Sequence, residues 1–371
     1  MNRVGLYLHF PFCKAKCAYC DFYSRCDLSK ISSYEKALCR GICQLAPMLS
    51  DSVVDTVYFG GGTPSLATGE GMRSIFHALR QRFSITADAE ITVEMNPEST
   101  TKELLITLRA LGANRISFGM QSAKASELSA IGRLHRHRDT ERAVSAAKEA
   151  GFENISLDLM YGLPGQDLSS FFESLTACVA LDPGHVSFYC LTLSPEVPLY
   201  KVRDTLPGEE VTREMYLAAH RFLEERGYEH YEISNAARKG FRSRHNLRYW
   251  QGLDYLGIGP GAHSLLKGER FSMKEDVDGF ISASNLFDTV EARETLTPKD
   301  RLVEYVMLSL RQKEGLSLAR LKALSDASTL ERAEKKLALW QRHGLCVKTE
   351  EGFALTPEGF FVSNEIISEL I

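Results

Sequence analysis

Three cysteines near the N-terminus place the strongest constraint on how this chain can fold. Cys13, Cys17 and Cys20 lie in the sequence CKAKCAYC, directly after an apolar stretch typical of a β-strand. Three thiolates in one short loop are soft ligands of the kind that hold iron–sulfur clusters. They leave one iron of a four-iron cluster without a protein ligand. The loop is therefore expected to lie where a further ligand can reach that iron.

Zinc is the main alternative for this loop. A structural zinc site normally has four protein ligands, so zinc would also need Cys26 or a distant histidine. Idle thiols are the remaining alternative. That interpretation is preferred for the scattered cysteines, because free cysteines of a reducing compartment are commonly small buried hydrophobes. These are Cys39, Cys43, Cys178, Cys190 and Cys346.

Strand-like and helical patterns alternate along the first half of the chain. Strands are expected at Gly5–Phe10, Asp55–Phe59, Glu90–Glu94, Asn114–Phe118, Asn154–Leu159 and His185–Leu191. Helices are expected at Ser33–Ala46, Met72–Phe83, Lys102–Leu111, Thr140–Ala150 and Leu168–Ala180. Such alternation predicts an α/β fold with a parallel sheet, here a partial (β/α)6 barrel. Functional side chains should gather where the strands end.

Three regions are expected along the chain. Residues 1–230 form the barrel core, and residues 231–296 form an accessory region that contains HNLRYW. Residues 297–371 form a small winged-helix-like helical domain, because Pro298 can begin a helix and LCVKTEEGFALT has the pattern of a hairpin. Packing or docking is its expected role.

Charge and hydropathy exclude some partners. The formal net charge is −4, and acidic residues are interleaved with the basic residues of the last region, so nucleic acid is not an expected partner. The apolar run at the N-terminus is too short for a signal peptide, and no stretch approaches the ~18 apolar residues of a membrane span. A cytoplasmic protein is expected, with any membrane contact made through partners.

A glycine-rich motif supports the iron–sulfur interpretation. In YFGGGTPS, Gly61 and Gly62 follow the second expected strand and permit close backbone approach to a ligand, although alone they would indicate only a tight turn. With the cysteine loop, this motif resembles the radical-SAM superfamily, in which S-adenosylmethionine chelates the open iron. The resemblance implies a 4Fe–4S cluster on the three cysteines. It also implies that the stretch containing Gly61, Gly62 and Thr63 meets the methionine amino group.

Within that superfamily, nearly the whole chain resembles the group of oxygen-independent coproporphyrinogen III oxidases. The matching motifs are LYLHFPFC, VEMNP, GMQS, IGRLHR and LDLMYGLPGQ. The resemblance implies S-adenosylmethionine contacts for Tyr7, Glu94, Gln121, Arg133 and Asp158. Carboxylates can accept from ribose hydroxyls or the amino group, and arginine can pair with the methionine carboxylate. For any single residue, a core or surface role is the alternative.

One departure from the oxidases points to a different branch. The oxidases carry a further cysteine two residues after the third ligand, whereas this chain has Phe22. The chain in this respect resembles the heme-chaperone branch, whose HNxxYW motif matches His245, Tyr249 and Trp250. Imidazole can ligate heme iron, and aromatic rings can cover a porphyrin face. The alternatives are an aromatic core patch around a hydrogen-bonded His245, and ligation by His263 of GPGAHS.

The resemblance implies a heme chaperone that binds heme, a 4Fe–4S cluster and S-adenosylmethionine. It would deliver heme to respiratory hemoproteins, and the cluster would promote a homodimer. An enzyme that oxidatively decarboxylates coproporphyrinogen III is the first alternative. A radical-SAM enzyme with an unrelated substrate is the second, because a barrel does not determine its substrate.

Overall fold

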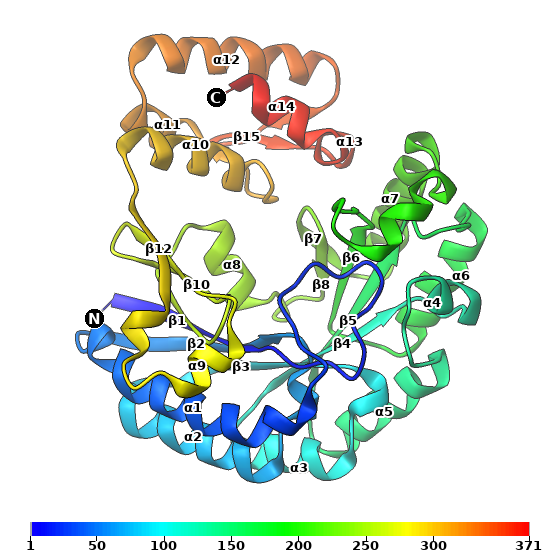
Figure 1. The fold of residues 1–371 in the computed structure, drawn as a ribbon. Helices are drawn as coiled ribbons and strands as arrows, with labels where there is room; N and C mark the ends of the chain where they lie inside the picture. Colours follow the sequence, from blue (N-terminus) through cyan, green and yellow to red (C-terminus); the bar gives the residue numbers. More distant parts are fainter. Residues whose placement is uncertain (1, 371) are drawn as a thin grey trace.

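The computed structural model describes residues 2–370, and its main element is one twelve-stranded sheet. Six neighbouring strands are parallel, and all six were expected from the sequence. They are β1 (Asn2–Phe10), β2 (Ser52–Gly61), β3 (Ile85–Met95), β4 (Arg115–Gln121), β5 (Asn154–Tyr161) and β6 (His185–Cys190). The strands are curved into an incomplete barrel, so the predicted fold class is confirmed (Figure 1).

Helices connect these strands and lie around the outside of the curved sheet (Figure 1). They are α1 (Ile31–Leu45), α2 (Gly69–Arg82), α3 (Lys102–Ala110), α4 (Ala125–Ala130), α5 (His137–Glu149) and α6 (Leu168–Ala180). Each longer helix buries one apolar face, as α1 does with Tyr34, Leu38 and Ile42. Every residue of β4 is buried, as expected for a strand of a parallel sheet covered on both faces.

The chain beyond β6 extends the same sheet at both ends. After α7 (Glu209–Glu224), β7 (Glu229–Glu232) and β8 (Asn235–Ala237) join the edge next to β6. At the opposite end β9 (Tyr255–Ile258) pairs in parallel with β1, followed by β10 (His263–Leu266), β11 (Glu269–Met273) and β12 (Val290–Thr295). Between these two groups lies α8 (Arg244–Trp250), and α9 (Val277–Ser282) precedes β12. The strands on both sides of residue 230 therefore share one sheet.

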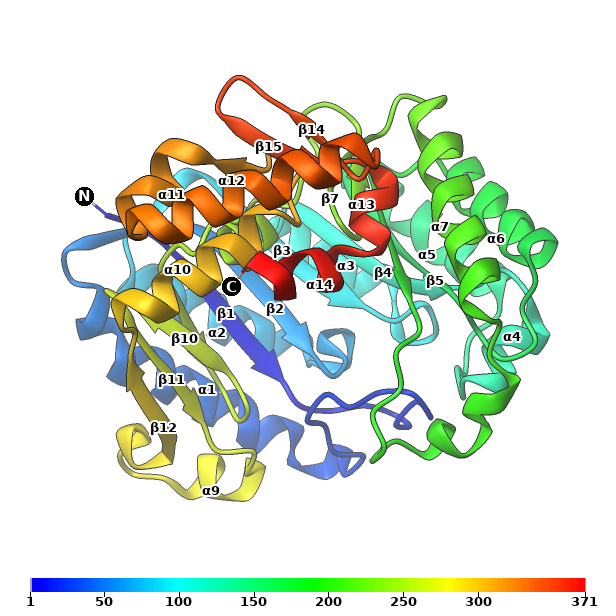
Figure 2. The same ribbon diagram turned by 90° about the horizontal axis from the view of Figure 1, so that it is seen from above.

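A small helical domain follows and lies above the sheet in Figure 1 and across the front of the view in Figure 2. Its elements are α10 (Pro298–Ser309), β13 (Leu316–Ser317), α11 (Leu318–Leu324), α12 (Ala327–Arg342), β14 (Cys346–Lys348), β15 (Gly352–Leu355), α13 (Pro357–Phe361) and α14 (Ser363–Leu370). Thr297 and Asp300 form a capping box at the start of α10. The expected hairpin is β14–β15, and two short helices, α13 and α14, follow it.

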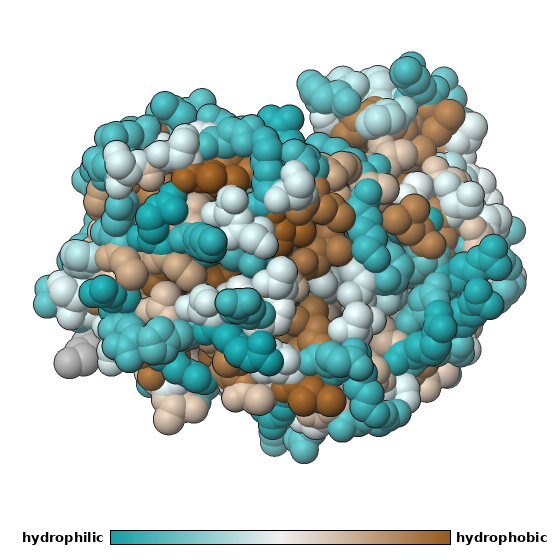
Figure 3. Space-filling view, turned by 60° about the horizontal axis from the view of Figure 1, so that its bottom comes forward, coloured by the Kyte–Doolittle hydropathy of each residue, from teal (hydrophilic) through white to brown (hydrophobic). Residues whose placement is uncertain are grey.

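The surface in Figure 3 is mainly hydrophilic, with smaller groups of hydrophobic residues between the polar ones. Scattered apolar groups of this kind are ordinary on protein surfaces. Among residues 2–370, no helix combines the length and the apolar character needed to cross a bilayer.

Candidate functional site

The cysteine loop follows β1 at the carboxyl end of the sheet. Cys13, Cys17 and Cys20 are half-buried and line one cavity of about 530 Å³. Backbone hydrogen bonds hold the loop: Cys13 donates to Arg25 (3.0 Å), and Ala18 donates to Ile131 (3.1 Å). The three thiols therefore face a common space, as the motif predicts.

Burial raises the pKa of Cys13 and of Cys20, and the neighbouring Cys17 adds to both shifts. Thr63 Oγ1 donates to Cys13 Sγ (3.4 Å), and Arg133 Nη1 donates to Cys17 Sγ (3.6 Å). Within residues 2–370, no group of three or more His, Cys, Asp and Glu side chains is arranged so that it could hold a metal ion. The donor set still fits an iron–sulfur cluster, and the positive cluster irons would stabilise the thiolates that burial disfavours.

Two glycines pack the end of β2 against the cysteine loop. Gly61 has a φ of 105°, which a residue with a side chain rarely adopts. A Cβ on Gly62 would lie 2.7 Å from the carbonyl oxygens of Phe10 and Phe12. Both glycines line the cavity, so their backbone can approach a ligand as the sequence predicts.

Four side chains predicted to contact S-adenosylmethionine line the same cavity as the cysteines: Glu94, Gln121, Arg133 and Asp158. Burial raises the pKa of Glu94 to about 7, although hydrogen bonds from Tyr58 Oη (2.6 Å) and the Gly61 N–H (3.2 Å) oppose this shift. Burial also raises the pKa of Asp158. Arg133 donates to the Gly119 carbonyl (2.6 Å). Strands β3, β4 and β5 and the loop after α4 thus bring these four side chains to one cavity.

Two predicted residues lie beside this cavity. Thr63 is buried and is hydrogen-bonded to two residues that line the cavity: its Oγ1 donates to Cys13 Sγ (3.4 Å) and accepts from Asn96 Nδ2 (3.1 Å). Tyr7 lines a neighbouring cleft, and its hydroxyl forms a hydrogen bond of 2.9 Å with His9 Nδ1.

Arg115 is a cavity residue that the sequence analysis missed. Its side chain is buried, with 1% exposed, and its Nε and Nη1 atoms have no hydrogen-bond partner within the described chain. A buried guanidinium is costly without an anionic or polar partner. These two donor nitrogens fit a carboxylate or hydroxyl of a bound molecule. An arginine at the start of a fully buried strand was the available sequence signal.

The HNLRYW motif forms α8, which is anchored to the sheet. The Glu90 carboxylate accepts hydrogen bonds from the backbone N–H groups of Arg244 and His245, each at 3.0 Å. Ser243 caps the helix by accepting from the Asn246 N–H (3.3 Å). Arg248 forms a buried ion pair with Asp55 of β2.

His245 belongs to the first turn of α8, and its side chain is fully buried. Its Nδ1 is hydrogen-bonded to Thr56 Oγ1 (2.9 Å) and its Nε2 to Tyr249 Oη (2.8 Å). The ring also stacks on Tyr58, with ring centres 5.1 Å apart. Burial lowers the pKa of His245 to about 3, and the charge of Arg248 adds to the shift. Iron ligation by His245 stays a prediction, and it would require one of these two hydrogen bonds to break.

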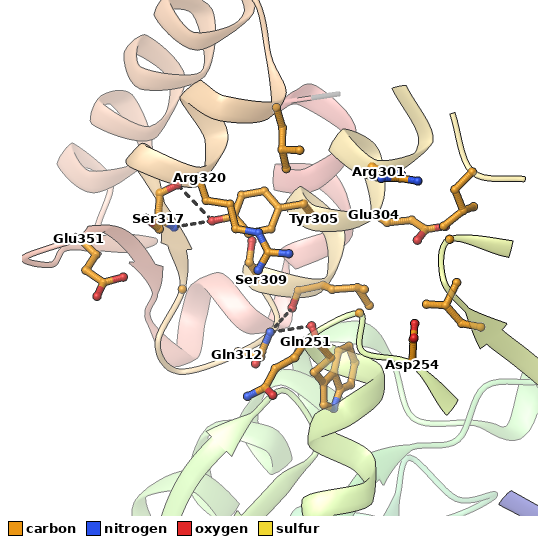
Figure 4. Close-up of a pocket in the computed structure, with 18 of the residues that line it drawn as sticks. Gln251, Asp254, Arg301, Glu304, Tyr305, Ser309, Gln312, Ser317, Arg320 and Glu351 are labelled. Carbon is orange, nitrogen blue, oxygen red and sulfur yellow. Dashed lines mark hydrogen bonds between the residues drawn. The ribbon is translucent and has the colours of Figure 1, made fainter. Parts of the chain in front are cut away.

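The structure does not bring the two aromatic residues of the motif together. Tyr249 lines the cleft that contains Tyr7, whose volume is about 720 Å³. Trp250 instead lines a separate cavity of about 620 Å³ between α8 and the C-terminal domain. Figure 4 shows this cavity, where Gln312 Nε2 donates to the carbonyl of Trp250 (2.8 Å).

The cleft beside Tyr249 adjoins the cysteine cavity. Both spaces are lined by Asp21, Phe22, Tyr58, Gly61, Glu94 and Asn246. The cleft alone adds Tyr7, His9, Tyr23, Tyr249, Tyr255, Gly261, His263 and Glu275. An aromatic cleft and a thiol-lined cavity therefore lie side by side and share part of their walls.

A partial α/β barrel with three cysteines after its first strand defines a radical-SAM-type protein. In agreement, residues 7–178 match the model of the radical SAM superfamily, and residues 296–362 match the HemN C-terminal domain. The chain is 24% identical to the solved coproporphyrinogen III oxidase HemN from Escherichia coli, with a TM-score of 0.86, covering 100% of this chain and 90% of that structure. This likeness shows the fold.

Relatives at higher identity define the family. The heme chaperone HemW of Synechocystis sp. is 34% identical, over 99% of this chain and 96% of the relative. The protein of that name from Bacillus subtilis is 33% identical, over 98% of both chains. The one from Mycobacterium tuberculosis is 36% identical, over 99% of this chain and 94% of the relative. The chain belongs to the HemW family.

Proposed function

We propose that this protein is a heme chaperone that binds heme and delivers it to respiratory hemoproteins. The names of its relatives support the heme-chaperone function. Delivery to respiratory hemoproteins is what the resemblance of the sequence implies. The structural observation that carries the proposal is the aromatic cleft that adjoins the cysteine cavity and shares lining residues with it. A porphyrin needs flat apolar walls, which the cleft offers, and the adjoining cavity offers the thiols of a cluster.

The cysteine cavity would hold the two resident cofactors. Cys13, Cys17 and Cys20 would hold a 4Fe–4S cluster, which supplies one-electron chemistry and an open iron. Glu94 and Asp158 can accept hydrogen bonds from an amino group or ribose hydroxyls, and Gln121 can do the same through its amide oxygen. Arg133 can pair with a carboxylate. The backbone at Gly61 and Gly62 lines the same cavity as these side chains and the three cysteines.

Phe22 argues against the coproporphyrinogen oxidase alternative. It stands where the oxidases carry their further cysteine, and 64% of its surface is exposed. The ring lines both the cleft and the cysteine cavity. A phenyl ring can neither ligate a metal nor transfer a hydrogen atom as a thiol does, but it can pack against a porphyrin.

One experiment separates the two functions. Protein reconstituted anaerobically with iron and sulfide is titrated with hemin while its absorbance spectrum is followed, and is assayed in parallel with coproporphyrinogen III and S-adenosylmethionine. We expect saturable hemin binding and transfer to an apo-hemoprotein, without formation of protoporphyrinogen. Efficient turnover of coproporphyrinogen, or absence of saturable hemin binding, would contradict the proposal.

A dimer is part of the same proposal. The cluster-loaded protein is expected to associate into a homodimer, and the cluster-free protein is expected to associate less. Sedimentation of both forms under anaerobic conditions tests this expectation.

A further inference from the structure

We propose that heme lies in the aromatic cleft with its iron ligated by His263, the first residue of β10. This inference rests on the proposed heme-chaperone function and identifies the part of the site that receives the iron. Three features support the proposal: the hydrogen bonds of the nearby histidines, the aromatic walls of the cleft and the charges around it.

The first argument is the availability of a ring nitrogen. The imidazole of a neutral histidine has one donor and one acceptor nitrogen, and iron needs the acceptor lone pair. His9 uses both nitrogens, because Nε2 bonds to the Tyr23 carbonyl (3.0 Å) and Nδ1 to Tyr7 Oη (2.9 Å). His245 also uses both, with Thr56 and Tyr249. Neither can ligate iron without losing a hydrogen bond.

His263 differs from His9 and His245 in its exposure and in its hydrogen bonding. Its side chain is exposed, and it has no hydrogen bond or ion pair with the rest of residues 2–370. It nevertheless lines the cleft. Its backbone is held in the sheet by pairing with Ser272 of β11. A free imidazole on a rigid strand meets the requirement for a ligand that is present before the cargo arrives.

The walls of the cleft suit a flat aromatic macrocycle. Its aromatic lining comes from Tyr7, Phe22, Tyr23, Tyr58, Tyr249 and Tyr255. Tyr249 and Tyr255 meet edge to face, with ring centres 4.7 Å apart. Phe22 is the most exposed of the large hydrophobic residues in the described chain, and a porphyrin in the cleft would cover its ring.

The charges around the cleft determine which edge of the heme enters. Asp21, Glu94 and Glu275 line the cleft, and none of the described residues that line it is Lys or Arg. The two heme propionates must therefore point outward, away from these carboxylates. At the rim, Arg25 Nε donates to Tyr23 Oη (3.4 Å) and its guanidinium lies 5.5 Å from the centre of that ring. Arg25 can therefore receive one propionate.

The proposal is tested on the full-length, anaerobically reconstituted protein by titration with hemin. His263→Ala should shift the Soret band and weaken hemin binding about tenfold or more, with unchanged iron and sulfide content of the cluster. Added imidazole should restore the original spectrum. Arg25→Gln should weaken binding severalfold and leave the Soret band in place.

Control variants make the outcome interpretable. His343 is exposed in the C-terminal domain, so His343→Ala should bind hemin as the unmutated protein does. Equal losses in His343→Ala and His263→Ala would show nonspecific surface binding and overturn the assignment. An unchanged Soret band in His263→Ala, with a shifted band in a folded His245→Gln variant, would also overturn it and assign the iron to His245. Failure of the unmutated protein to bind hemin would instead refute the proposed function itself.

Discussion

The titration of Glu232 provides a quantitative test of how strands β7 and β8 hold α8. Its carboxylate is fully buried and accepts hydrogen bonds from the Ser234 N–H (2.9 Å), from the Asn235 side chain and from Trp250. Burial raises the pKa of Glu232 from 4.5 to about 7 in spite of these donors. The carboxylate therefore links the edge strand β7 to the last residue of the HNLRYW helix.

The sign of the effect on stability follows from proton binding. Because the folded-state pKa is raised, the folded protein binds more protons than the unfolded chain between about pH 4.5 and 7. The contribution of Glu232 to stability is fully present below pH 4.5 and is lost as the pH rises through about 7. The separation of the two pKa values corresponds to on the order of 3 kcal/mol.

Glu232→Gln should remove this dependence, since the amide does not titrate. Urea denaturation of both proteins at several pH values between 4.5 and 8.5 gives the difference in unfolding free energy. We expect this difference to move in favour of the glutamine variant by about 3 kcal/mol as the pH rises. The exposed Glu350→Gln serves as a control with a constant difference. A constant difference for Glu232→Gln as well would show that Glu232 titrates normally and refute the reasoning.

Three further predictions concern the site and its support. Cys17→Ala should abolish the absorbance and the iron content of the reconstituted cluster, whereas Cys26→Ala should retain both; loss of the cluster in Cys26→Ala would mean that the ligand set is wrong. Asp158→Asn should weaken the change that S-adenosylmethionine causes in the EPR spectrum of the reduced cluster, and an unchanged response would remove Asp158 from the pocket. Arg248→Met should lower the unfolding free energy by about 3 kcal/mol in urea denaturation, because it leaves the buried Asp55 with only the longer ion pair to the exposed Arg3 (3.7 Å); a loss below 1 kcal/mol would contradict this.

The barrel was predictable because its signals are local. Each of the strands β1–β6 is an apolar run followed by a helical pattern, and the structure confirms all six. Because parallel strands end at one edge of a sheet, residues as distant as Cys13 and Asp158 were expected to meet, and they line one cavity.

The extension of the sheet was not predictable in the same way. β9 is four residues long and pairs with β1, whose sequence carries no signal for a partner so far away. The environment of His245 was hidden for a similar reason. Thr56, its hydrogen-bond partner, is distant in sequence, so the motif alone could not show whether a ring nitrogen of His245 was free.

The pairing of β1 with β9 cannot form until β9 has been synthesised. β1 leaves the ribosome well before β9, because Gly5 pairs with Tyr255, which follows about 250 residues later. At typical synthesis rates, roughly 12 to 50 seconds separate the two strands. One edge of β1 stays unpaired during that time and offers free backbone groups to other chains. Truncated products that end before Tyr255 should therefore aggregate more readily than chains that include β9.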